Sequence, residues 1–174
     1  MKFIQATLVL TVFLSLALVA QQPAAKIPNF KFFTLDHHSF TDKNLKAGRK
    51  LLFIFFDVTC EHCQRAITTF NRNGNELNNA AVYLITLDNQ ASINQFMKKY
   101  GSNLYHKKNV TILQDLQNQF ISKFGPGKYP SMFLYSPDRK LILYGDDDKK
   151  AGEFLKAVNG TFDVSSHRHD IRKG

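Results

Sequence analysis

The sequence contains only two cysteines and no tryptophan among its 174 residues. Small secreted domains that lack a sufficient core rely on several disulfides, so a single pair excludes a disulfide scaffold. Stability must therefore come from burial of apolar side chains, and hydrophobic residues make up 44% of the chain, with 16 phenylalanines. A disulfide between Cys60 and Cys63 would restrict the unfolded chain very little, so chemistry explains the pair better than stabilisation.

Long apolar runs are also scarce, and the one that exceeds the length of a strand lies at the N-terminus. Residues 8–20 carry no charge, follow Met1-Lys2 and precede a polar segment. This pattern predicts a signal peptide over residues 1–20. An uncleaved anchor is the alternative, although the run is shorter than the roughly 18 to 20 residues that span a bilayer. Either interpretation predicts a periplasmic or otherwise extracytoplasmic protein.

Acidic residues are few, 14 against 23 lysines and arginines, and the formal net charge is +9. Part of this excess lies in residues 161–174, which we expect to form a basic, flexible tail. The aromatic residues lie in apolar runs typical of a core, not between basic residues, so we expect no nucleic-acid partner. The charge favours solubility and a weak attraction to an anionic membrane surface.

The remaining pattern predicts one α/β domain over residues 29–160, preceded by a linker at 21–28. The run at 51–56 is uniformly apolar, as in a strand buried on both faces of a parallel sheet, and should be the central strand. Further strands are expected near 30–35, 80–87, 131–135 and 141–144, with a short strand or extended link at 110–113, and helices from 60 and at 92–100, 116–124 and 149–158. This order predicts a mixed sheet with a parallel core, a terminal antiparallel hairpin and helices on both faces.

The sequence Cys60-Glu61-His62-Cys63 follows the most apolar strand after a short turn. A strand-to-helix turn places Cys60 at a helix N-terminus, where backbone N–H groups and the helix dipole favour the thiolate over the thiol. The pattern indicates a redox site.

This motif, together with Pro130 at the start of a strand and hairpin, resembles the thioredoxin fold. The N-terminal signal, the helical insertion before the proline and the run at 129–142 are similar to the extracytoplasmic TlpA-like and redoxin group of thiol-disulfide oxidoreductases. The resemblance implies disulfide exchange with protein thiols, with Cys60 as the attacking sulfur and Cys63 as the resolving one. It implies no organic cofactor and a separate redox partner, and we expect a monomer.

The resemblance also assigns roles to the neighbours of the cysteines. Glu61 and His62 occupy the positions that tune the redox potential. His62 is expected to donate to the Cys60 thiolate, whereas the Glu61 carboxylate opposes its formation. Pro130 resembles the family's cis-proline, which would lie against the cysteines with Tyr129 flanking the substrate. An exposed turn residue and a trans proline are the alternatives for His62 and Pro130.

Three positions depart from the relatives. Thr59 stands where thioredoxins carry Trp, Ile54 replaces their buried acid, and Ala66 replaces the acid of ResA-type reductases. No obvious proton acceptor is left for Cys63. Asp57 is a candidate by position, but a loop-capping role is equally consistent with its type. These gaps put a role in cytochrome c maturation in doubt.

Three other functions would use the same pair. A copper or zinc carrier would use both cysteines and His62, with His37 or His38, but structural zinc needs four ligands. A peroxidase of the peroxiredoxin type would need a proline and a threonine or serine where Phe53 and Asp57 stand. The third is a non-catalytic binding module with a structural disulfide.

Overall fold

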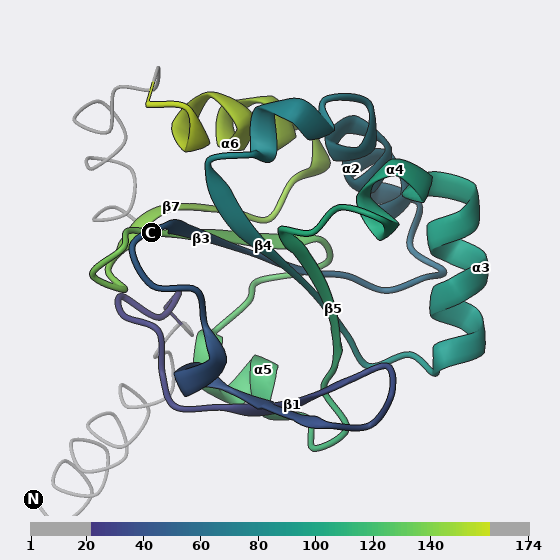
Figure 1. The fold of residues 1–174 in the computed structure, drawn as a ribbon, viewed down its shortest axis with the longest axis horizontal. Coiled ribbons are helices and arrows are strands. Elements are labelled where there is room, and N and C mark those ends of the chain that lie inside the picture. The colour runs from purple at the N-terminus through teal and green to yellow at the C-terminus, as the bar shows by residue number, and fades with distance from the viewer. Residues whose placement is uncertain (1–21, 161–174) are drawn as a thin grey trace, which may run out of the picture.

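A seven-stranded sheet organises the computed structural model of the protein, which describes residues 22–160 (Figure 1). Its strands are β1 (Lys31–Thr34), β2 (Ser39–Thr41), β3 (Lys50–Phe55), β4 (Ala80–Thr86), β5 (Val110–Gln114), β6 (Ser131–Tyr135) and β7 (Leu141–Gly145). The expected signal peptide and basic tail lie outside the described residues.

The strands lie in the order β2-β1-β5-β4-β3-β6-β7. The pairs β3 with β4 and β4 with β5 are parallel, whereas β6 pairs antiparallel with β3 and with β7. The predicted parallel core and terminal hairpin are therefore confirmed. The expectation that β3 is the central strand needs one correction, because β4 occupies the middle of the order and β3 lies beside it. Strand order is decided by long-range pairing, which a local apolar run does not specify.

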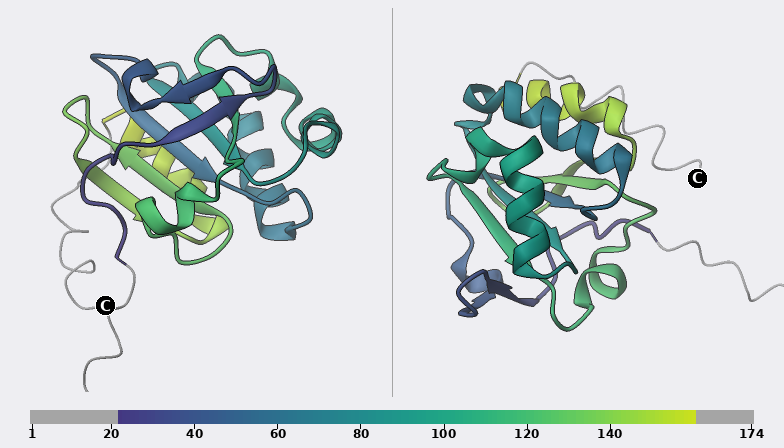
Figure 2. Two further views of the ribbon diagram at one scale, coloured as in Figure 1. Left: turned by 90° about the horizontal axis from the view of Figure 1, so that it is seen from below. Right: turned by 90° about the vertical axis from the view of Figure 1, so that its right-hand side faces the viewer.

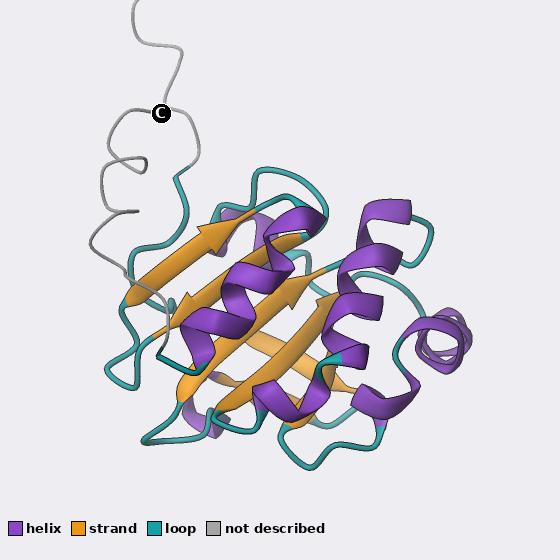
Figure 3. Ribbon diagram, turned by 90° about the horizontal axis from the view of Figure 1, so that it is seen from above, coloured by secondary structure: helices purple, strands orange, loops and turns teal. Residues whose placement is uncertain are grey.

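The helices are α2 (Glu61–Arg72), α3 (Gln90–Tyr100), α4 (Ser102–Tyr105), α5 (Gln119–Phe124) and α6 (Ala151–Val158), with 3-10 turns η2 (Asp42–Asn44), η3 (Gly74–Leu77) and η4 (Asp148–Lys150). Helices α2 and α6 lie side by side across one face of the sheet, and α5 lies on the other (Figures 2 and 3). Helices therefore cover both faces, as predicted. None of the helices in residues 22–160 is long and apolar enough to cross a bilayer.

Helix α5 begins three residues later than the sequence suggests, at Gln119 instead of 116. Asn118 adopts a left-handed backbone conformation with φ 53°, which no helix interior tolerates. The Asp115 carboxylate accepts the N–H of Phe120 at 2.7 Å and so satisfies one of the free donors of the helix start. The preceding residues form a turn instead of a first helical turn.

Strand β3 divides its side chains between two apolar clusters, one on each face of the sheet. Leu52 and Ile54, and Phe56 directly after the strand, face the cluster that contains residues of α2, α3, α4 and α6. Leu51, Phe53 and Phe55 face a second cluster, in which the rings of Phe55 and Phe120 stack at 4.4 Å. The alternation follows from the two-residue repeat of a strand. The loop that leads to Cys60 therefore begins from a strand packed on both sides.

Residues 22–28, suggested above as a linker, lie along the hairpin of β6 and β7. The N–H of Leu141 donates to the carbonyl of Ala25 at 2.9 Å, and the N–H of Ile27 donates to the carbonyl of Arg139 at 3.1 Å. These bonds satisfy part of the edge that β7 would otherwise expose.

Candidate active site

Cys60 caps the N-terminus of α2, at the end of the loop that follows β3. Its backbone is extended, with φ −75° and ψ 117°, and its carbonyl accepts the N–H of Gln64 at 3.1 Å. The side chain is half-buried. The thiol therefore lies where the unpaired N–H groups of a helix start favour an anion, and solvent reaches it.

Cys63 lies in the first turn of the same helix and is fully buried. It belongs to the apolar cluster beside α2, and its sulfur accepts the backbone N–H of Asp57 at 3.5 Å. Burial raises the pKa of the Cys63 thiol well above its ordinary value; the hydrogen bond from the Asp57 N–H opposes this in part, and Cys60 and then the Asp57 carboxylate add to the rise. Both cysteines are free thiols in this structure. Solvent reaches Cys60, whereas Cys63 is buried behind it and keeps its proton.

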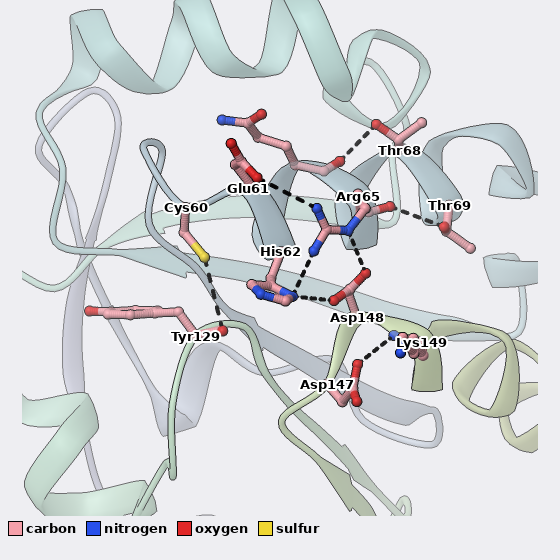
Figure 4. Close-up of polar contacts among 11 residues, drawn as sticks. Cys60, Glu61, His62, Arg65, Thr68, Thr69, Tyr129, Asp147, Asp148 and Lys149 are labelled. Atoms are coloured by element: carbon pink, nitrogen blue, oxygen red, sulfur yellow. Dashed lines mark hydrogen bonds and ion pairs between the residues drawn. The ribbon is translucent and has the colours of Figure 1, made fainter.

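Pro130 follows a cis peptide bond and lies next to the cysteine site. The carbonyl oxygen of the preceding residue, Tyr129, is 4.0 Å from the Cys60 sulfur (Figure 4). The ring of Tyr129 packs against Phe55 with centroids 4.8 Å apart, and burial raises the pKa of Tyr129 to about 12. The Tyr129 phenol is therefore uncharged at neutral pH. Packing against Phe55 holds the residue in place beside the Cys60 sulfur.

His62 makes its hydrogen bonds with residues of α2 and η4. Its Nδ1 lies 2.5 Å from Oδ1 of Asp148, and Nη2 of Arg65 lies 2.7 Å from the same nitrogen (Figure 4). Within the described residues, its hydrogen bonds go to Asp148 and Arg65, and none reaches Cys60. Sequence reasoning missed Asp148 as a site residue, because 146–148 reads as three acids that cap the next helix.

Glu61 extends into solvent, with its side chain 84% exposed. Its carboxylate pairs with Arg65, whose Nη1 lies 3.9 Å away, one turn along α2. Exposed pairs of this kind contribute little, because water and salt screen them.

The sequence matches the AhpC/TSA family over residues 23–143. The chain belongs to the AhpC/TSA family. No curated protein sequence matches it.

Solved structures with the same thioredoxin-like fold are similar to most of this AhpC/TSA-family chain. MTB DsbF is 20% identical, with a TM-score of 0.64 over 80% of this chain and 98% of its own. A putative thiol:disulfide interchange protein DsbE from Chlorobium tepidum is 18% identical, with a TM-score of 0.63 over 78% and 96%. A secreted disulfide oxidoreductase of Mycobacterium tuberculosis is 16% identical, with a TM-score of 0.59 over 74% and 95%. These likenesses confirm the predicted fold.

In this family member, two carboxylates hold the loop between β3 and α2. Oδ1 of Asp57 accepts the backbone N–H of Thr59 at 2.7 Å and its hydroxyl at 2.6 Å, so the loop-capping interpretation of Asp57 is confirmed. Oδ2 of Asp88, which follows β4, accepts the N–H of Val58 at 3.0 Å and the hydroxyl of Thr86 at 2.6 Å. Asp88 was not identified from the sequence as a residue of the site. Its position just after β4, the strand that pairs with β3, would have placed it near the loop that carries Cys60. Together the two carboxylates fix the loop that presents Cys60.

The positions that carry acids in relatives are apolar here. Ile54 and Ala66 are both fully buried, and Ile54 shares the apolar cluster with Cys63. The Asp57 carboxylate raises the pKa of the Cys63 thiol, after the larger effects of burial and of Cys60.

The histidines considered as metal ligands lie in the turn between β1 and β2. Nδ1 of His38 is 2.7 Å from the carboxylate of Asp36, and both side chains are exposed. His37 has a left-handed backbone with φ 64°. Over residues 22–160, no three His, Cys, Asp or Glu side chains are grouped to hold a metal ion.

Proposed function

We propose that this chain is an exported thiol-disulfide oxidoreductase that exchanges disulfides with cysteines of other proteins through Cys60 and Cys63. The observation that supports it best is the asymmetry of the two sulfurs. Cys60 is reachable at a helix N-terminus, while Cys63 is buried one turn further on and protonated. Exchange through a mixed disulfide needs an exposed attacking sulfur with a shielded one close behind.

The reaction proceeds in two displacements. The Cys60 thiolate attacks one sulfur of a partner's disulfide, forms an intermolecular S–S bond and releases the other sulfur as a thiolate. Cys63 then attacks the Cys60 sulfur, forms the internal disulfide and releases the second partner sulfur, which receives the proton that Cys63 gives up. The partner gains two electrons and the chain loses two. A dithiol carrier returns the pair to the reduced state, and the reverse steps insert a disulfide into a partner.

The edge formed by Tyr129 and Pro130 is the proposed place of the partner segment. An extended chain that lies along this edge brings its sulfur toward Cys60, because the Tyr129 carbonyl is already next to that sulfur. Neither displacement needs an organic cofactor. The N-terminal apolar run supports export to the periplasm or another extracytoplasmic compartment, and one neighbour in structure is a secreted protein.

A peroxidase reaction is not proposed, despite the family to which the chain belongs. Phe53 and Asp57 stand where a peroxiredoxin-type site would need a proline and a hydroxyl side chain, and Phe53 is fully buried. A thiolate without such groups lacks the means to activate peroxide.

Trapping of mixed disulfides tests the proposed roles. Cys63→Ala should accumulate covalent, reductant-sensitive complexes with other proteins, because the second displacement is blocked. Cys60→Ala should accumulate none, since its remaining sulfur is buried. Complexes are separated by non-reducing gels from periplasmic extract, with the wild-type chain as the reference. Equal trapping by both variants would contradict the assignment, and absence of trapping together with a pair that glutathione cannot reduce would favour a binding module.

A further inference from the structure

We propose that Asp148 is a positioning residue of the cysteine site: its carboxylate binds His62 and Arg65 of α2 and limits the positive charge that these side chains offer to a thiolate at Cys60. The inference rests on the proposed function. Neither the family nor the motif assigns a role to this residue, which reaches the site from η4, after β7.

The contacts of Asp148 use both of its oxygens. Oδ1 lies 2.5 Å from Nδ1 of His62, and Oδ2 accepts Nε–H of Arg65 at 2.9 Å. The Asp148 side chain is only 9% exposed, whereas that of His62 is 62% exposed. Charge-assisted hydrogen bonds are stronger when one partner is shielded from water. The buried Asp148 carboxylate therefore holds the more exposed His62 and Arg65 side chains in position.

Both charged neighbours of His62 contact the same ring nitrogen, Nδ1. An ionised carboxylate only accepts hydrogen bonds and a guanidinium only donates them, so Nδ1 of His62 meets an acceptor on Asp148 at 2.5 Å and a donor on Arg65 at 2.7 Å. The Arg65 guanidinium, followed by the His62 imidazole, holds the pKa of the Asp148 carboxyl below its usual value, and the group is therefore ionised at neutral pH.

The sign of the effect follows from the position of these side chains on α2. His62 and Arg65 belong to the first two turns of the helix whose N-terminus is Cys60, and a positive charge there favours the thiolate. Cys60 in turn raises the pKa of the Arg65 guanidinium, after the larger effects of Asp148 and Glu61. The Asp148 carboxylate opposes these cations. Because only the reduced chain contains the thiolate, Asp148 makes the pair less oxidising than it would otherwise be.

Other charges surround the same place. Glu61 and Arg72 of α2 and Lys149 of η4 line one pocket with Arg65 and Asp148. Asp147 is also adjacent, but its Oδ1 accepts the backbone N–H of Lys149 at 2.9 Å and contacts neither His62 nor Arg65. It provides a matched control, because its change to asparagine removes the same charge one residue away.

The experiment compares wild type, Asp148→Asn and Asp147→Asn in glutathione buffers near pH 8, above the range in which imidazoles usually ionise. We expect Asp148→Asn to shift the equilibrium about threefold to tenfold toward the reduced chain, which corresponds to about 14 to 30 mV. Alkylation of Cys60 should accelerate in parallel, since the thiolate is the reactive form. Asp147→Asn should shift the equilibrium less than about twofold, since its carboxylate is screened by solvent.

Arg65→Gln provides the opposite perturbation if Asp148→Asn folds poorly. Loss of this cation should make the pair more reducing and slow the alkylation of Cys60. Equal equilibria for Asp148→Asn and wild type, equal shifts in both asparagine variants, or a shift toward the oxidised chain would each overturn the inference. The proposed function has a separate failure: a wild-type pair that does not exchange with glutathione at all.

Discussion

The buried thiol of Cys63 predicts how the stability of the reduced chain changes at alkaline pH. In the folded chain this group keeps its proton, because it is fully buried and its pKa is raised. In the unfolded chain it ionises near its ordinary pKa of about 8.5. Above that pH the folded state holds more protons than the unfolded state, so the free energy of unfolding falls as pH rises.

The magnitude follows from the linkage relation for one proton. Each pH unit above about 8.5 costs about 1.4 kcal/mol, so stability should fall by about 2 kcal/mol between about pH 8.5 and pH 10 through Cys63 alone. Below about pH 8.5 the contribution is constant, because both states hold the proton.

Comparing the urea unfolding of Cys60→Ala with that of the double variant Cys60→Ala/Cys63→Ala isolates the contribution of the Cys63 proton to the free energy of unfolding. No disulfide forms in either chain, and the tyrosines and lysines titrate alike in both. Near pH 7 the double variant should be less stable by about 1 kcal/mol, because a buried sulfur is lost from an apolar cluster. Near pH 10 it should be the more stable chain, since it has no buried thiol to keep protonated. Parallel curves from pH 7 to pH 10 would refute the reasoning.

Two further predictions concern other parts of the molecule. Phe120→Ala should destabilise the fold by about 3 to 5 kcal/mol in urea unfolding, because its fully buried ring is lost. The matched control is Leu116→Ala, whose side chain is 52% exposed and should cost less than about 0.5 kcal/mol. The lowered pKa of Asp148 predicts stability that is present above the unfolded value of about 3.9 and is lost as pH falls through the folded value. Asp148→Asn should therefore lose less stability than wild type between pH 6 and pH 3 in thermal unfolding, and an equal loss would contradict this.

The parts of the structure that the sequence predicts well are those decided by local pattern. The uniform apolar run of β3, the start of α2 at the cysteine motif and the hairpin after Pro130 all follow from neighbours in the chain. The positions of Cys60 and Cys63 followed with them, since a strand-to-helix turn fixes which sulfur caps the helix. The cis bond before Pro130 was expected only from the resemblance to the thioredoxin fold, because composition does not reveal it.

The parts that the sequence does not predict depend on distant contacts. His62 and Asp148 are separated by 86 positions, and the three acids at 146–148 look alike to any local rule. Only the packing of η4 against α2 decides that Asp148 faces the imidazole while Asp147 caps its own turn. The late start of α5, by contrast, has a local cause, because the Asp115 carbonyl accepts the N–H of Asn118 at 3.3 Å and the Asp115 carboxylate accepts that of Phe120 at 2.7 Å.

The unequal depth of the two sulfurs also bears on chemical damage. Peroxide is not activated at this site, so its reaction is slow; when it occurs, Cys60 is the first sulfur reached, and its thiolate becomes a sulfenic acid with release of water or an alcohol. Cys63, one turn along the helix, then condenses with that group to give the disulfide and a second water molecule, which forestalls the irreversible sulfinic stage. Cys63 itself is sheltered by the apolar side chains around it. An encounter with oxidant thus ends in a form that ordinary thiol reductants restore.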